Sequence, residues 1–329
     1  MRIFTARRRW SAAAVALLTV VTGAVVNPAP ASAAAVNKNP KFIQVYVNNV
    51  ENLLSPGERC AGDWRNLIKY MKSQPYSPDL FLVQQINPRG ELPRLLDHMN
   101  KQLAGGFKAV VAVPSPVKHV PDNDCGQEKA YQTNVIIYRV GRFELKGAKS
   151  VWQSRRPGSC GAPAELSRSI NVAQRLRDKV TGKDVAVASI HWPWHGRGTS
   201  PTSCPQQNAD LTASKMKAFT GAKLYIAGGD FNQRDRDGEG FRGWHKKMRN
   251  VHGYADAAVE RCAGEPGTTL NCTLKHHWTH GGGESRIDYL FAKRPAGKAP
   301  MSAEHTISYN EAGKQRYSTH RAIRARIHY

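Results

Sequence analysis

The chain has 329 residues, of which 40% are hydrophobic and 22% charged, so it is long enough to bury a sizeable core. No internal repeat, low-complexity tract or long linker follows residue 40, which excludes a repeat protein and indicates one domain. The formal net charge of +23 favours a polyanionic partner, namely nucleic acid, an anionic membrane face or a cell-wall polymer. A merely soluble basic surface is the alternative.

Residues 1–33 have the pattern of a secretory signal peptide. Three arginines at 7–9 precede an apolar run at 12–26, and the small residues at 31–33 form a cleavage site. The run is shorter than the ~20 apolar residues of a membrane span, so we expect a secreted protein without a transmembrane anchor after processing. Export by the Sec or the twin-arginine route stays open. The segment carries four arginines and no acid, so the expected mature domain, residues 34–329, keeps a net charge of +19.

Six cysteines follow the predicted signal, and an even number in an exported chain predicts disulfide bonds. Cys262 and Cys272 flank a turn-rich loop, so we expect these two to pair. No Cys-x-x-Cys or His-rich spacing indicates zinc. The remaining four are not assigned from the sequence: Cys60, Cys125, Cys160 and Cys204.

The elements alternate between strands and helices without a regular βαβ period, which predicts a mixed α/β protein. A strand is expected at 41–47, and Asp63 then caps a helix with apolar residues at positions 64, 67, 68 and 71. A leucine stripe at 92–103 and the segment 208–219 indicate two further helices. Further strands are expected at 80–83, 135–138, 185–190, 224–227, 287–291 and 322–327. The last of these alternates apolar residues with arginines, as in a half-buried strand with a basic outer face.

The sequence GGDFN at 228–232 follows the apolar run at 224–227, so a buried strand ends there with two oxygen-bearing side chains. Two glycines allow a sharp turn and the close approach of a ligand. Asp230 and Asn232 are two residues apart and would share one face of an extended chain. A carboxylate beside an amide suits a phosphate, a hard cation or an attacking water. A plain strand-to-turn junction is the alternative.

Polar residues recur at the ends of the other predicted strands. They are Asn49, Gln85, His191, Asp288 and the Ser-Thr-His run that ends at His320. Each alone is a weak signal. Because loops at strand ends build sites on a rigid sheet, their recurrence predicts a common rim.

In order and context these segments resemble the endonuclease/exonuclease/phosphatase superfamily, which has the deoxyribonuclease-like fold. The resemblance runs from residue 41 to the C-terminus. It implies a four-layer α/β sandwich with two mostly antiparallel sheets packed face to face, helices outside and a phosphoester-cleaving site at one sheet edge. The segments that carry it are NVENL at 49–53, DLFLVQQ at 79–85, SIH at 189–191, GDFN at 229–232, RIDY at 286–289 and STHR at 318–321.

The resemblance also implies roles for individual residues. His320 resembles the general base that activates water, and Asp288 resembles its carboxylate partner. His191 resembles a second histidine that contacts the phosphate and assists the leaving group. Asp230 and Asn232 resemble the pair that positions water and the scissile phosphate.

Two further positions complete the expected site. Asn49 resembles the amide near the metal. Arg168 lies where many members place an arginine that reaches the phosphate, and a solvated surface arginine is the alternative.

Two departures concern the divalent-metal position. Gln85 stands where the family usually has a glutamate, and Thr319 stands where it usually has an aspartate. Magnesium prefers anionic oxygen ligands, so Asn49, Gln85 and Asp230 would hold Mg²⁺ or Ca²⁺ only through a weakened site. The alternatives are an enzyme that has lost the metal and a protein that binds without cutting.

We therefore expect a secreted, monomeric phosphodiester hydrolase, a nuclease that acts on DNA or RNA by histidine-activated water attack. The alternatives are a phospholipase C- or sphingomyelinase-like enzyme that meets anionic lipid, and a non-catalytic polyanion-binding relative. Tryptophans 192, 194 and 278 lie beside histidines of the rim and either stack on bases or pack in the core. Basic residues near the predicted rim are Arg234, Arg236, Lys275 and Arg321.

Overall fold

Two facing β-sheets form the centre of the molecule. The computed structural model describes residues 34–51, 62–118, 131–156, 159–163, 167–194, 203–237, 240–263, 269–280, 285–313 and 316–329. All of them belong to the compact unit Ser32–Tyr329. The predicted signal segment, Cys60 and Cys125 lie outside the described residues.

The first sheet has the strand order β16-β17-β1-β2-β4-β3. Strands β1 and β2 are parallel, and the other neighbours are antiparallel. The strands are β1 (Phe42–Asn49), β2 (Leu80–Ile86), β3 (Phe107–Val111), β4 (Thr133–Arg139), β16 (Met301–Thr306) and β17 (Ile323–His328).

The second sheet has the order β13-β14-β10-β9-β8-β5, with β15 beside β14. Here β9 and β10 are the parallel pair. The strands are β5 (Phe143–Gln153), β8 (Ile170–Asp178), β9 (Lys183–His191), β10 (Leu224–Asp230), β13 (Ala255–Asp256), β14 (Asp288–Arg294) and β15 (Gly297–Lys298). Two small ribbons pair β6 (Arg155–Arg156) with β7 (Ser159–Pro163), and β11 (Arg236–Asp237) with β12 (Gly240–Phe241).

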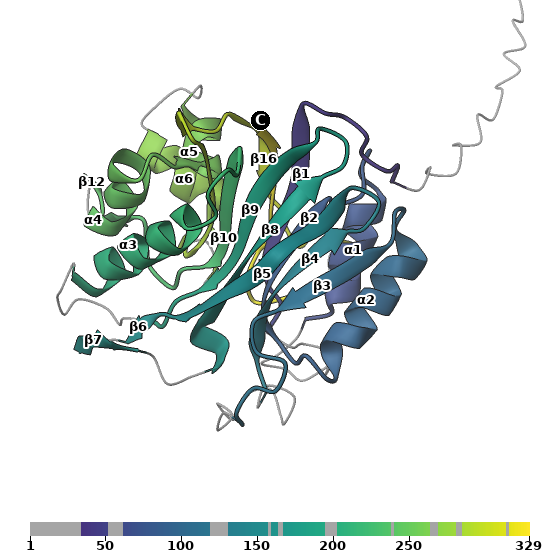
Figure 1. Ribbon diagram of the computed structural model, residues 1–329, viewed down its shortest axis with the longest axis horizontal. Helices are drawn as coiled ribbons and strands as arrows, with labels where there is room; N and C mark the ends of the chain where they lie inside the picture. Colours follow the sequence, from purple (N-terminus) through teal and green to yellow (C-terminus); the bar gives the residue numbers. More distant parts are fainter. Residues whose placement is uncertain are drawn as a thin grey trace, which may run out of the picture. The chain divides into compact units, whose positions relative to one another are not determined.

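Helices cover the outer faces of both sheets, so the expected four-layer α/β sandwich is confirmed (Figure 1). The central core lies between the sheets, where apolar side chains of β1, β2, β4 and β17 meet those of β8, β9, β10 and β14. Helices α1 and α2 pack on the first sheet, while α3 and α4 pack on the second. The helices are α1 (Trp64–Lys72), α2 (Glu91–Gln102), α3 (Ser203–Lys217), α4 (Gly243–Lys246), α5 (Ala257–Cys262) and α6 (Thr269–His277), with short turns η2 (Ser167–Ser169) and η3 (Lys247–Val251).

Local sequence explains the elements that were predicted. The Asp63 side chain accepts a hydrogen bond from the backbone N–H of Arg65 and so caps α1, whose apolar stripe is buried. Strand β17 alternates buried apolar residues with half-buried Arg324 and Arg326, as its pattern predicts. Each of the predicted strands is present, with ends displaced by a few residues.

Several elements were not predicted, for identifiable reasons. Strand β5 carries exposed lysines, and its pairing with β8 is irregular around Gly147, so it has no clear period of two. Strand β8 interrupts its apolar pattern with the buried polar residues Asn171 and Gln174. Helices α5 and α6 are short and joined by the predicted Cys262–Cys272 disulfide, which is confirmed. A second disulfide joins Cys160 to Cys204.

The strand directions bring the polar strand ends together. Strands β1 and β2 run in parallel, as do β9 and β10, so each pair ends at one edge of its sheet. Strands β17 and β14 are antiparallel to β1 and β10, so their beginnings lie at those same edges. The common rim expected from the sequence is therefore a consequence of topology.

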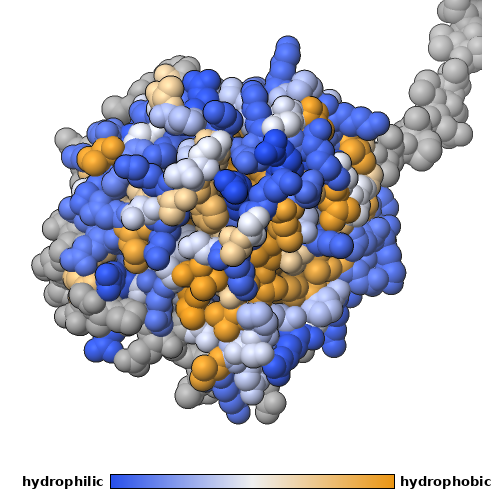
Figure 2. Space-filling model, in the orientation of Figure 1, coloured by the Kyte–Doolittle hydropathy of each residue, from blue (hydrophilic) through white to orange (hydrophobic). Residues whose placement is uncertain are grey.

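The surface is polar over much of the face shown in Figure 2, with hydrophobic residues near its centre. Strand β5 contributes Leu145 and Val151 to the exposed large hydrophobic side chains. No helix within the described ranges is long and apolar enough to cross a membrane.

Gly229 is the position where the fold tolerates no side chain. Its φ of +151° disfavours other residues, and a Cβ there would lie 1.9 Å from the carbonyl oxygen of Ile190 on the neighbouring strand. We expect Gly229→Ala to lower the free energy of unfolding by more than about 3 kcal/mol, because backbone must move. Thermal and denaturant unfolding measure this.

Gly221→Ala is the matched control, because Gly221 also has a positive φ, +83°, but no atom lies within 4 Å of the added Cβ. It should lower the free energy of unfolding by only about 1–2 kcal/mol. Equal decreases in the free energy of unfolding for the two variants would contradict the clash at Gly229.

Candidate active site

Three neighbouring strands of the second sheet place His191, Asp230 and Asp288 side by side. In the register, Asp230 at the end of β10 is the partner of His191 on β9 and of Asp288 on β14. All three side chains are buried. Strand pairing alone therefore gathers one imidazole and two carboxylates at the sheet edge.

The first sheet adds Asn49 and His320 from the opposite side. Asn49 Nδ2 donates to Asp230 Oδ2 at 2.9 Å, which joins the two sheets at the rim. The backbone around His320 is fixed, because its N–H donates to Ser318 Oγ at 3.1 Å and its carbonyl accepts from Asn48 Nδ2 at 3.1 Å. The imidazole is therefore held at the junction of the sheets.

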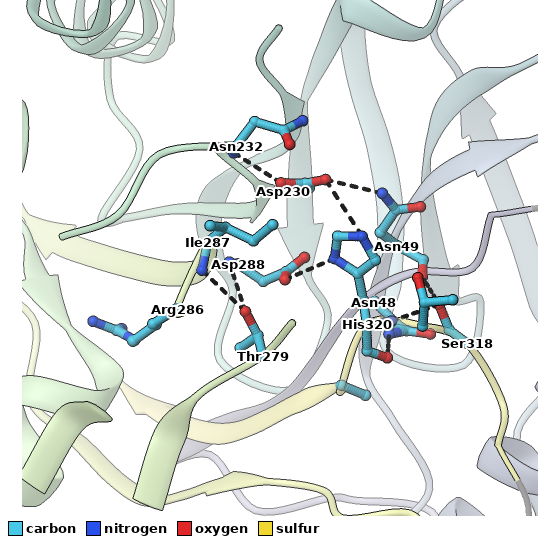
Figure 3. Close-up of polar contacts among 12 residues, drawn as sticks. Asn48, Asn49, Asp230, Asn232, Thr279, Arg286, Ile287, Asp288, Ser318 and His320 are labelled. Atoms are coloured by element: carbon cyan, nitrogen blue, oxygen red, sulfur yellow. Dashed lines mark hydrogen bonds and ion pairs between the residues drawn. The ribbon is translucent and has the colours of Figure 1, made fainter. Parts of the chain in front are cut away.

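The His320 ring lies between two carboxylates (Figure 3). Its Nδ1 is 2.9 Å from Asp288 Oδ2, and its Nε2 is 3.9 Å from Asp230 Oδ2. The backbone N–H of Asp288 donates to Thr279 Oγ1 at 3.0 Å, which fixes the start of β14. This is the predicted imidazole–carboxylate pair, with the second ring nitrogen directed towards Asp230.

Burial and charge together set the protonation of this cluster. Burial, reinforced by the charge of Asp288, raises the pKa of Asp230 to about 7. Burial disfavours the imidazolium form of His320, but Asp288 and Asp230 outweigh it and raise the pKa of His320 to about 10. Near neutral pH, His320 thus holds a proton and Asp230 is partly protonated.

His191 is in the opposite electrostatic state. Burial, together with the positive charges of Arg168 and His320, lowers the pKa of His191 well below its usual value. Its Nε2 lies 3.6 Å from Asp230 Oδ2 and 3.4 Å from Gln85 Nε2. A neutral imidazole whose Nε2 accepts from the Gln85 amide fits this arrangement, so Gln85 orients His191.

Asn232 follows a turn and not an extended backbone, so the condition for a face shared with Asp230 is not met. Its φ of +49° turns the backbone after β10, and its N–H donates to Asp230 Oδ1 at 2.8 Å. Its side-chain Nδ2 donates to the carbonyl of Trp192 at 2.9 Å. Asn232 therefore holds Asp230 through its backbone and Trp192 through its side chain.

Glu51 is a site residue that the sequence analysis missed. Its carboxylate accepts hydrogen bonds from the backbone N–H of Thr319, at 3.1 Å, and from the Thr319 hydroxyl. A carboxylate from the loop after β1 thus lies against Thr319, where the family resemblance led us to expect an aspartate. A glutamate two residues beyond the strand-end Asn49 was the available signal.

His280 was missed as well. Its ring centroid lies 4.7 Å from that of His320, and burial together with the charge of His320 lowers the pKa of His280. No motif marks it; the segment is held near His320 by the bridge between His280 and Ser285 and by the hydrogen bond from the Arg321 N–H to the Thr279 carbonyl.

A cavity of about 410 Å³ opens onto the cluster. Arg168 lines it, which places the loosely matched arginine at the site and not on a remote surface. Asn49 and Asp288 contact residues of its wall from behind. The described lining residues are Glu51, Gln85, Arg168, Ser169, His191, Trp192, Pro193, Trp194, Asp230, Asn232 and His320.

Backbone strain is concentrated in this wall. Within the described ranges, the non-glycine residues with positive φ are Glu51 at 50°, Gln85 at 55° and Asn232 at 49°, and all three line the cavity. Such conformations cost about 1 kcal/mol or more each and cluster at functional sites.

Other residues expected near the rim have different surroundings. Trp192 is fully buried, and Arg321 is buried with its guanidinium 4.3 Å above the Trp278 ring. Arg234, Arg236 and Lys275 are not among the described residues of the cavity wall. Of the predicted aromatic and basic residues, only Trp194 and Arg168 therefore reach the cavity with an accessible or charged group.

The fold is shared with solved structures of endonuclease/exonuclease/phosphatase proteins. The catalytic domain of human Nocturnin with bound sulfate has a TM-score of 0.59 and 16% identity, over 87% of this chain and 94% of that chain. A family protein from Leptotrichia buccalis C-1013-b has a TM-score of 0.57 and 16% identity, over 87% and 100% of the two chains. D. rerio TDP2 with a single-strand DNA product has a TM-score of 0.56 and 12% identity, over 88% and 99%.

At these identities the likeness shows the fold, which confirms the architecture expected from the sequence resemblance. No protein-family model matches the sequence, and no curated protein is similar to it.

The electrostatic coupling of the site can be tested at Asp288. Replacing Asp288 by Asn removes the leading charge that raises the pKa of His320 and leaves the burial that lowers it. We expect the pKa of His320 to fall by about 1–3 units in Asp288→Asn, as measured by NMR titration of the imidazole signals.

Asp210→Asn is the control, since Asp210 forms a separate pair with His252, whose Nε2 lies 2.8 Å from Asp210 Oδ1. That variant should leave the titration of His320 unchanged. A His320 titration that is the same in Asp288→Asn and in the native protein would contradict the coupling.

Proposed function

We propose that this protein is a secreted phosphodiester hydrolase, a nuclease that cleaves DNA or RNA. The observation that carries the proposal is the meeting of His320 and Asp230 in one cavity wall, with Asp288 behind His320 and Arg168 in the same cavity. Two carboxylates that share one imidazole can move a proton, and an arginine can bind the phosphate that receives the attack.

His320 is the proton acceptor in this proposal. Water attacks the phosphorus, a new P–O bond forms, and the proton of the water passes to the neutral form of His320 at Nε2. That form becomes more populated as the pH rises towards the raised pKa of about 10. Asp288 fixes the ring by accepting from Nδ1 and stabilises the imidazolium that results.

Asp230 positions the attacking water beside the base, since its Oδ2 lies 3.9 Å from His320 Nε2. As the bond from phosphorus to the leaving oxygen breaks, that oxygen takes a proton from solvent water. Asn49 and the backbone N–H of Asn232 orient the two oxygens of this carboxyl group. His191, neutral through its lowered pKa, packs beside Asp230 without adding a charge.

The donor set in the cavity fits a hard divalent cation. Glu51 and Asp230 offer carboxylate oxygens and Gln85 offers an amide oxygen, all in one cavity wall. Glu51 thereby supplies the anionic ligand that Thr319 lacks. Mg²⁺ or Ca²⁺ held by these residues would neutralise charge on the phosphoryl oxygens.

Nucleic acid is the substrate class that the charge favours. The net charge of +23 gives a strongly basic protein, and lysines and arginines that neutralise phosphates release counterions. D. rerio TDP2, which has this fold, is seen with a single-strand DNA product. The lipid alternative has weaker support, because within the Trp-Pro-Trp segment Trp192 is buried and Trp194 alone of the two rings is exposed.

The test of function is hydrolysis by the mature chain and by His320→Ala, with plasmid DNA, single-stranded DNA, RNA and sphingomyelin vesicles as substrates. We expect nucleic acid to be cleaved, and His320→Ala to lower kcat/KM by about 10²–10⁴-fold, because a general base is lost. His252→Ala is the matched control, since His252 also pairs with an aspartate but lies outside the cavity wall.

Full activity in His320→Ala would remove His320 from the mechanism. Release of choline phosphate without any cleavage of nucleic acid would favour the lipid enzyme. Tight, salt-sensitive DNA binding without turnover at any metal concentration would favour a non-catalytic binding protein.

The metal can be tested at Glu51. We expect Glu51→Gln to weaken Mg²⁺ or Ca²⁺ binding by at least about 10-fold, because a neutral oxygen replaces an anionic ligand. Isothermal titration calorimetry and the metal-dependent shift in Tm measure this, and a chelator should lower the Tm of the native protein more than that of Glu51→Gln.

Glu144→Gln is the control, because Glu144 pairs with Lys146 on an exposed strand away from the cavity wall. The same metal affinity in Glu51→Gln and in the native protein would exclude Glu51 as a ligand.

A further inference from the structure

Trp194 is an exposed indole in the wall of the cavity. Its side chain is 68% exposed, although it belongs to the most apolar class of large side chains. Four other tryptophans within the described ranges are buried, and Trp278 is half-buried under Arg321. An aromatic ring left in solvent beside a cluster of polar groups is a feature of binding sites and not of packing.

The chain that carries Trp194 is anchored to the active site. The backbone N–H of Trp192 donates to the carbonyl of Asp230 at 3.0 Å, and the carbonyl of Trp192 accepts from Asn232 Nδ2 at 2.9 Å. The buried Trp192 ring packs on Phe231, with 4.6 Å between centroids. Pro193 then restricts the following backbone. Trp194 is therefore only two residues from Trp192, whose backbone is fixed to the active site by these hydrogen bonds.

The cavity offers two chemically different regions. His320, Asp230 and Arg168 provide the groups for a phosphate, whereas Pro193 and Trp194 provide an apolar, partly planar surface. A nucleotide has the same two parts, an anionic phosphate and a planar base with exposed π-faces. The cavity volume of about 410 Å³ is in the range of small-ligand sites, about 300–1,000 Å³.

We propose that Trp194 is a stacking subsite for an unpaired nucleobase next to the scissile phosphate, so that the substrate is single-stranded nucleic acid. This rests on the proposed hydrolase function and narrows its substrate class. A base inside a duplex already stacks on its neighbours, so only an unpaired base can present a free face to the indole. The subsite selects for the presence of a base and not for its identity, because every base has a π-face.

The experiment compares two dinucleotides that differ in one feature. One carries thymine on both sugars, and the other is abasic on both sides of the same phosphodiester. For the native protein we expect kcat/KM to be higher for the base-bearing substrate by about 5- to 100-fold, mostly through KM. Trp194→Ala should bring this ratio close to one, while Trp194→Phe should retain most of it.

Val251→Ala is the control for the loss of an exposed apolar side chain, since Val251 is 69% exposed and does not line the cavity. It should leave the ratio unchanged. The preference for a single-stranded oligonucleotide over the same strand in a duplex should also shrink in Trp194→Ala and persist in Val251→Ala.

The stacking subsite and the hydrolase activity are tested by different outcomes of these measurements. If the native protein cleaves both dinucleotides equally, or Trp194→Ala keeps the native ratio, the stacking subsite is overturned while the hydrolase stands. If no substrate is cleaved, the hydrolase fails, and fluorescence anisotropy with oligothymidylate and an abasic oligomer still decides the matter. Equal binding of both oligomers, or Trp194-dependent binding to sphingomyelin vesicles alone, overturns the subsite.

Discussion

The site depends on one constraint, the burial of two carboxyl groups at the edge where the sheets meet. Asp230 and Asp288 are neighbours in the register of β10 and β14, and isolation of two such charges from water would be strongly unfavourable. The His320 imidazole between them offsets part of this charge, and Asn49 donates to Asp230 from the other sheet. The free energy of this buried group is lowest when its members share protons. Burial therefore costs stability and at the same time shifts the pKa values towards those needed for acid–base chemistry.

The topology makes this burial possible. A parallel pair lies at the centre of each sheet, flanked by antiparallel strands, so the ends of four strands and the starts of two converge. At that edge β9 and β10 approach so closely that only a glycine fits at position 229. Rigid strands can then hold residues that are far apart in the sequence in a narrow geometry. Other site residues, namely His320, Arg168, Asn232 and Glu51, lie outside the strands.

Much of the fold and part of the site could be predicted from the sequence. Polar residues at the end of an apolar run identified His191 and Asp230, and one at the start of a run identified Asp288, because strand pairing needs little else to bring them together. Glu51 and the orientation of Gln85 towards His191 could not be found in this way. Both residues have a left-handed backbone, and a side chain in that conformation leaves the face that the period of two assigns to it.

The same conformations explain why the two absent acidic residues need not mean an absent anionic site. Glutamine at 85 and threonine at 319 remove two carboxylates from the positions that the resemblance assigns to a metal. The strained backbone at Glu51 turns one carboxylate back to the Thr319 hydroxyl, beside the same cavity. A carboxylate from the loop after β1 thus lies beside Thr319 in space. A strained residue persists only where its surroundings fix it. Glu51, Gln85 and Asn232 all have a positive φ and all line the cavity, which indicates a wall shaped for a ligand.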